Sequence, residues 1–101
     1  MNKFLLFSKD SCGPCKLVEK YFSAMNDERT SIIEKIDLED FGSTPTQEAV
    51  EIAKKYSVTA TPVLLVIKED DENCVLEEHI GGVNITKNIK PVLDKYYVKS
   101  A

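Results

Sequence analysis

Runs of apolar residues, separated by polar stretches, divide the 101-residue chain into strands and helices. Apolar runs of strand length predict strands over residues 3–8, 32–38, 62–68 and 74–80. Apolar residues that recur every three or four positions predict a helix after each of the first two strands and another after the last. The first helix is expected to run from Cys12 or Gly13 to Met25. The predicted order is therefore β-α-β-α-β-β-α.

This order predicts an α/β protein with a mixed four-stranded sheet and helices on both faces. Strands separated by helices are expected to pair in parallel through right-handed crossovers. The last two strands, joined by an acidic turn at residues 69–73, are expected to form an antiparallel hairpin at the edge. A chain of this length has room for one domain, over residues 1–101, with one modest core.

Local signals set the expected beginnings of the second and third helices. Thr44 is a candidate N-cap, with Pro45 at the first helical position and Gln47 completing a capping box. Pro91 lies among the apolar positions of the last helix, where a proline would remove a hydrogen bond and clash with the preceding turn. The regular part of this helix is therefore expected to begin near Asn88, or to be kinked there.

Composition narrows the classes of protein that the chain can represent. It is 43% hydrophobic and 30% charged, with a net charge of −4, which argues against nucleic acid as the main partner. No apolar run approaches the roughly 20 residues that span a membrane, and the apolar N-terminal run is interpreted as a strand, not a signal peptide. Three cysteines, an odd number, argue against a secreted disulfide framework and favour the reducing cytoplasm.

Candidate chemistry lies in the turn between the first strand and the first helix, where Cys12 and Cys15 are two residues apart. Free N–H groups at a helix N-terminus stabilise a thiolate, so Cys12 is expected to attack a disulfide and Cys15 to resolve the intermediate. Pro14 suits the first turn of the helix. A metal or iron–sulfur site remains an alternative, but two cysteines supply only half of a four-thiolate set and Pro14 disfavours it.

The sequence resembles the thioredoxin-like superfamily from residue 3 to about residue 97. Cys12-Gly13-Pro14-Cys15-Lys16 is similar to the thioredoxin motif, while Phe7-Ser8-Lys9 is more similar to the glutaredoxins. Residues 58–65 resemble the stretch around the family's cis-proline, and Gly81-Gly82 precedes the last helix, as it does in the family. The chain thus looks like a small thioredoxin with glutaredoxin-like features.

The resemblance implies the thioredoxin fold and assigns roles to particular residues. Cys12, Cys15, Gly13, Pro14 and a cis Pro62 would form the catalytic site. A substrate backbone would pair with Thr61 beside the sulfurs, as an added strand does. The residues implied at the substrate-binding surface are Lys9, Ser11, Thr61, Gly81 and Gly82.

The chain also departs from the family. Thioredoxins usually have a buried acid six residues before the first cysteine, and here that position is Leu6. The lysine that accompanies the acid corresponds to Lys35, which is expected to lack its partner, and resolution by Cys15 is expected to be slow. Ser11 stands where thioredoxins have tryptophan. The motif lies so near Met1 that the first strand and helix of full-length thioredoxins are expected to be absent.

The resemblance implies a dithiol reductant of protein disulfides, with ribonucleotide reductase among the candidate substrates. The electron donor would be a thioredoxin reductase or glutathione. One alternative is a glutathione-dependent glutaredoxin that uses Lys9, Thr61 and Gly81-Gly82, and another is a non-catalytic subunit of a larger complex. The redox-active disulfide would need no cofactor and no metal. We expect a monomer that binds neither nucleic acid nor membrane.

Overall fold

The computed structural model describes residues 2–9, 12–38 and 47–97. These residues form the elements in the predicted order, with one added 3-10 helix, η1. The elements are β1 (Lys3–Ser8), α1 (Gly13–Met25), η1 (Glu28–Ile32), β2 (Ile33–Asp37), α2 (Gln47–Lys55), β3 (Val63–Lys68), β4 (Asp71–Ile80) and α3 (Gly82–Tyr96).

The four strands form one mixed sheet in the order β2-β1-β3-β4. β1 and β2 pair in parallel, as predicted, and β3 and β4 form the predicted antiparallel hairpin. The expectation that β3 would also pair in parallel was wrong, because β3 is antiparallel to β1, with Val63 opposite Phe7. β3 therefore begins at the end of the sheet where β1 finishes.

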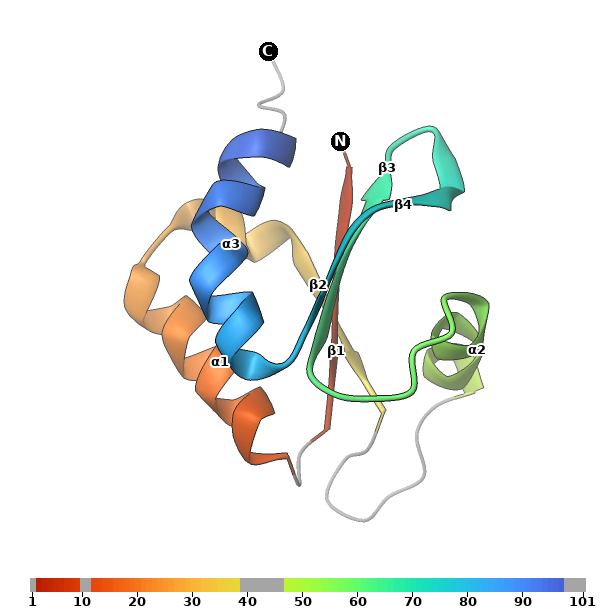
Figure 1. Ribbon diagram of the computed structural model, residues 1–101, viewed down its shortest axis with the longest axis horizontal. Coiled ribbons are helices and arrows are strands. Elements are labelled where there is room, and N and C mark those ends of the chain that lie inside the picture. Colours follow the sequence, from red (N-terminus) through yellow and green to blue (C-terminus); the bar gives the residue numbers. More distant parts are fainter. Residues whose placement is uncertain (1, 10–11, 39–46, 98–101) are drawn as a thin grey trace.

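The helices cover both faces of the sheet, as predicted (Figure 1). Side chains alternate along each strand, so the central strands supply two cores. On the side of α1 and α3, Phe4 and Leu6 of β1 pack with Leu64 and Val66 of β3. On the side of α2, the alternate residues pack with Ala49 and Ala53, and these are Leu5, Phe7, Val63, Leu65 and Ile67.

α3 begins at Gly82, so the predicted start near Asn88 was wrong. Pro91 lies inside the helix and costs it about 3 kcal/mol. Ile85 and Ile89 are both fully buried in the core on the α1 side, and each contributes about 1.5–3 kcal/mol. Burial therefore outweighs the proline, and the Asn88 side-chain amide donates to the Asn84 carbonyl within the helix, at 2.7 Å, instead of capping it.

Smaller differences concern the ends of elements. β4 begins at Asp71, so the acidic turn is confined to Glu69 and Asp70. The predicted N-cap Thr44 and the following Pro45 lie outside the described residues. Within the described ranges, no helix has both the length and the apolar character that crossing a membrane requires.

Candidate active site

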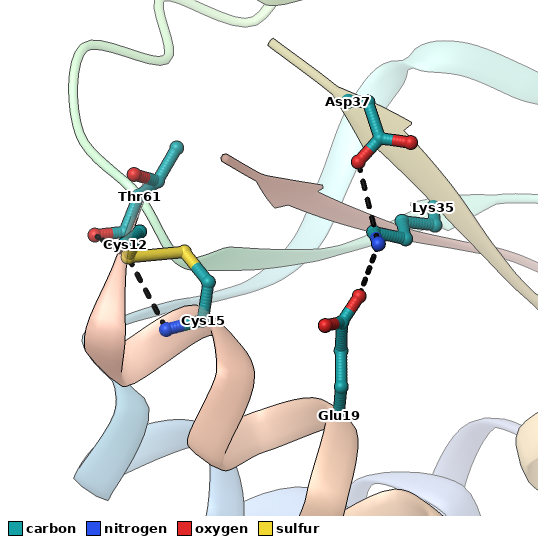
Figure 2. Close-up of a disulfide and its surroundings, with 6 residues drawn as sticks. All are labelled: Cys12, Cys15, Glu19, Lys35, Asp37 and Thr61. Atoms are coloured by element: carbon teal, nitrogen blue, oxygen red, sulfur yellow. Dashed lines mark hydrogen bonds and ion pairs between the residues drawn. A yellow bond between two sulfur atoms is a disulfide. The ribbon is translucent and has the colours of Figure 1, made fainter. Parts of the chain in front are cut away.

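Cys12 and Cys15 form a disulfide at the N-terminus of α1, with their Cα atoms 5.2 Å apart (Figure 2). Cys12 is the N-cap of the helix, and the backbone N–H of Cys15 donates to its sulfur at 3.2 Å. Cys15 is 2% exposed, whereas Cys12 is half-buried. In the reduced protein the same N–H would stabilise a thiolate on Cys12, which is the more accessible nucleophile.

The segment that leads into β3 approaches the same disulfide. The Thr61–Pro62 peptide bond is cis, as the resemblance implied. The sulfur of Cys12 lies 3.8 Å from the carbonyl oxygen of Thr61 (Figure 2). This contact exists because β1 and β3 are antiparallel, which brings the start of β3 to the end of β1. The carbonyl oxygen of Pro62 accepts a hydrogen bond from the N–H of Gly81 at 2.9 Å, which ties the two loops together.

Two glycines, Gly81 and Gly82, lie where α3 begins, next to the turn that holds the cysteines. Gly81 has a φ of +94°, a backbone conformation that other residues rarely adopt. A Cβ on Gly82 would lie 3.2 Å from the carbonyl oxygen of Pro14 and 3.3 Å from its Cβ. Gly82 thus packs directly against the turn that holds the cysteines. Substrate binding by either glycine stays a prediction, and Ser11 lies outside the described residues.

Lys35 lacks the acid that Leu6 replaces, as expected, but it has other ion-pair partners. Its ammonium group contacts the carboxylate of Glu19 on α1 and lies 3.4 Å from Asp37 (Figure 2). The hydrogen bond to Glu19, helped by the charge of Asp37, raises the pKa of Lys35. Leu6 is buried and, with Glu19 and Lys35, lines a cavity of about 290 Å³. Glu19 on α1 therefore pairs with Lys35. In thioredoxins the corresponding acid is expected on the first strand, where this chain has Leu6.

A groove of about 310 Å³ opens beside Thr61, on the face of the sheet that α2 covers. Lys9, predicted at the substrate-binding surface, and Thr61 both line this groove. Lys54 also lines it, and sequence reasoning missed this residue because its position depends on the docking of α2. We call it the α2 groove, and its lining residues are Lys9, Leu38, Val50, Ala53, Lys54, Val58, Thr59, Ala60 and Thr61.

In the part of the chain that the structure describes, no three of the histidine, cysteine, aspartate and glutamate side chains gather in a way that could hold a metal ion. The only cysteine described apart from the active-site pair is Cys74, which is free and half-buried on β4. Cys12 at the helix N-terminus, with the buried Cys15 bonded to it, forms an arrangement suited to disulfide exchange.

Comparison with solved structures confirms the predicted fold class. Thioredoxin O2 from Arabidopsis thaliana, in its oxidised state, matches with a TM-score of 0.68 and 21% identity, over 97% of this chain and 76% of that one. Thioredoxin f2 from Chlamydomonas reinhardtii matches with a TM-score of 0.66 and 18% identity, over 97% of this chain and 82% of that one. The fold is the thioredoxin fold.

Two thioredoxins are similar to the chain in sequence. No family model matches the chain. Thioredoxin H2 from Arabidopsis thaliana is 33% identical over 80% of this chain and 55% of its own length, and a thioredoxin from Echinococcus granulosus is 37% identical over 72% and 58%. Over these stretches the chain is similar to thioredoxins. It spans little more than half the length of these curated relatives.

Proposed function

We propose that the chain is a thiol–disulfide oxidoreductase that reduces disulfides in proteins. The observation that carries the proposal is the disulfide between Cys12 and Cys15 at the N-terminus of α1, with the Thr61 carbonyl 3.8 Å from the sulfur of Cys12. The helix N-terminus favours a thiolate, and the Thr61 backbone lies beside the reacting sulfur, where an extended substrate segment can pair with it.

The proposed reaction moves two electrons from the dithiol protein to the substrate. The Cys12 thiolate attacks one sulfur of the substrate disulfide, so that bond breaks and a substrate thiolate leaves, taking up a proton. Deprotonated Cys15 then attacks the sulfur of Cys12 in the mixed disulfide. The second substrate thiol is released, and the Cys12–Cys15 disulfide seen in the structure is formed.

The partners of this reaction are part of the proposal. Either a thioredoxin reductase or glutathione would return the protein to the dithiol form, and ribonucleotide reductase is one candidate substrate. No cofactor beyond the cysteine pair is needed for these steps. A monomer in the reducing cytoplasm suits this chemistry, because transient catalytic disulfides are the usual kind in that compartment.

The test is reduction of insulin disulfides with NADPH, supported in parallel by thioredoxin reductase and by glutathione with glutathione reductase. Turnover with at least one donor system, abolished in Cys12→Ser, is the expected result. Turnover with thioredoxin reductase alone would assign that enzyme as the electron donor. Turnover with glutathione alone would assign glutathione as the electron donor. A protein whose cysteines cycle between dithiol and disulfide but which reduces no substrate with either donor would contradict the proposal.

A further inference from the structure

The α2 groove combines an apolar lining with two cationic groups. Leu38, Val50, Ala53 and Val58 supply apolar side chains, and Lys9 and Lys54 are exposed. The two lysines come from the end of β1 and from α2, so only the folded chain brings them to one site. The groove is larger than a single carboxylate requires and has room for an aliphatic side chain as well.

Neither lysine of the groove is paired with a carboxylate of the described residues. Other lysines are paired: Lys55, the neighbour of Lys54, contacts Glu72 at 3.1 Å. Because neither Lys9 nor Lys54 has a carboxylate partner among the described residues, these two exposed cations form a locally positive part of the groove, although the whole chain carries a net charge of −4. Such a region favours a bound anion and disfavours a basic segment.

Thr61 connects the groove to the reacting sulfur. It lines the groove, and its carbonyl oxygen lies 3.8 Å from the sulfur of Cys12. In Figure 1 the segment that follows α2 crosses the end of the sheet and leads into β3. An extended substrate that reacts at Cys12 advances about 3.3 Å per residue, so residues within about four positions of its cysteine reach the groove.

We propose that the α2 groove selects protein substrates that have an aliphatic side chain and an acidic side chain within about four residues of the reacting cysteine. The aliphatic side chain lies against the apolar lining, and the carboxylate contacts Lys9 and Lys54. This inference rests on the proposed disulfide reduction, and it names the class of substrate that the same site prefers.

The experiment compares two peptides that differ in one residue. Each contains an intramolecular disulfide followed by Leu-Glu or by Leu-Gln, and each is mixed with the pre-reduced protein and quenched with acid for chromatography. Exposed lysine–carboxylate pairs are worth about 0.2–1 kcal/mol, so the glutamate peptide is expected to react about fivefold faster at low ionic strength. Added salt is expected to reduce this ratio.

Variants show whether the groove causes the preference. Lys54→Glu is expected to abolish it, because the new carboxylate offsets the charge of Lys9, and Lys9→Gln is expected to reduce it about twofold. Lys20→Gln is the matched control, because it removes the same charge from an exposed position of α1 outside the groove, and it is expected to keep the wild-type ratio.

Four results would overturn the inference. Equal rates for the two peptides with the wild type would show that the groove does not favour an acidic side chain. The proposed reduction of protein disulfides would still stand. An unchanged ratio in Lys54→Glu would show that the preference arises elsewhere. Faster reaction with glutathione disulfide than with either peptide would make the groove a site for a small thiol. If neither peptide is reduced, the proposed function fails and the inference fails with it.

Discussion

Replacement of Gly82 by alanine tests how tightly α3 holds the cysteine turn. The added Cβ would lie 3.2 Å from the Pro14 carbonyl oxygen and 3.3 Å from the Pro14 Cβ, so either α3 or the turn must move by a few tenths of an ångström. Gly82 is buried, and it contacts the backbone and the rigid ring of Pro14, which cannot rotate away as a flexible side chain can. The substitution is therefore expected to destabilise the protein.

The size of this effect follows from two opposing contributions. Alanine is preferred over glycine in a helix by about 0.5–1 kcal/mol. Overpacking a close contact costs about 1–3 kcal/mol. The net loss for Gly82→Ala is expected to be about 1 kcal/mol, which lowers the Tm of a domain of this size by about 4–8 °C.

Thermal unfolding of the disulfide form measures this difference, with Gly13→Ala as the control. Gly13 also lies at the start of a helix, but a Cβ there would meet nothing within 4 Å. The helix preference for alanine is unopposed there, so the control is expected to be about 0.5–1 kcal/mol more stable than the wild type. A Gly82→Ala protein that is as stable as Gly13→Ala would refute the argument that close packing of α3 supports the turn.

Three further predictions concern the active site and the ion pairs. Cys15→Ser is expected to accumulate a mixed disulfide with substrate on Cys12, seen by mass spectrometry, and an equal yield of adduct in Cys12→Ser would show that the assigned order of attack is wrong. Hydrogen bonds from a neighbouring arginine lower the pKa of Asp27, so its stabilising effect is present above the pKa of the unfolded chain and is lost as the pH falls through the lower folded value. Urea unfolding is thus expected to show that Asp27→Asn is less stable than the wild type at pH 7 but not at pH 2, and the same gap at both pH values would count against this. Leu6→Asp removes a buried leucine, at a cost of about 2–3 kcal/mol, but sets a carboxylate on β1 opposite Lys35 of β2. It is expected to speed resolution of the mixed disulfide in single-turnover reactions, and an unchanged rate would remove the hypothesis that resolution is slow without this acid.

The sequence was sufficient for the local parts of the site. The apolar run of β1, the spacing of Cys12 and Cys15 and the helical pattern that follows them all act within a few residues. They predicted a strand-to-helix turn with both cysteines at the helix N-terminus, and the structure confirms it. The cis bond before Pro62 was predicted from the resemblance and not from the residues, because most such bonds are trans.

Sequence analysis was wrong or incomplete where contacts between distant parts of the chain decide the structure. Pro91 suggested a late start for α3, but the burial of Ile85 and Ile89 against the sheet extends the helix back to Gly82. Lys35 was expected to lack the acid that Leu6 replaces, and it does, but the sequence did not indicate any other partner. The carboxylate of Glu19 comes instead from α1, and no pattern within β1 or β2 could have indicated it.

The sequence by itself determined the order of the elements, the two-sided burial of the central strands and the position of the cysteine pair, because hydrophobic periodicity and helix-terminus chemistry are local. Only the tertiary structure decided that β3 runs antiparallel to β1, which brings the Thr61 carbonyl to the sulfur of Cys12. It also decided that Lys9 and Lys54 share the α2 groove. Both depend on how α2 docks on the sheet, which is settled by the burial of surfaces that lie far apart along the chain.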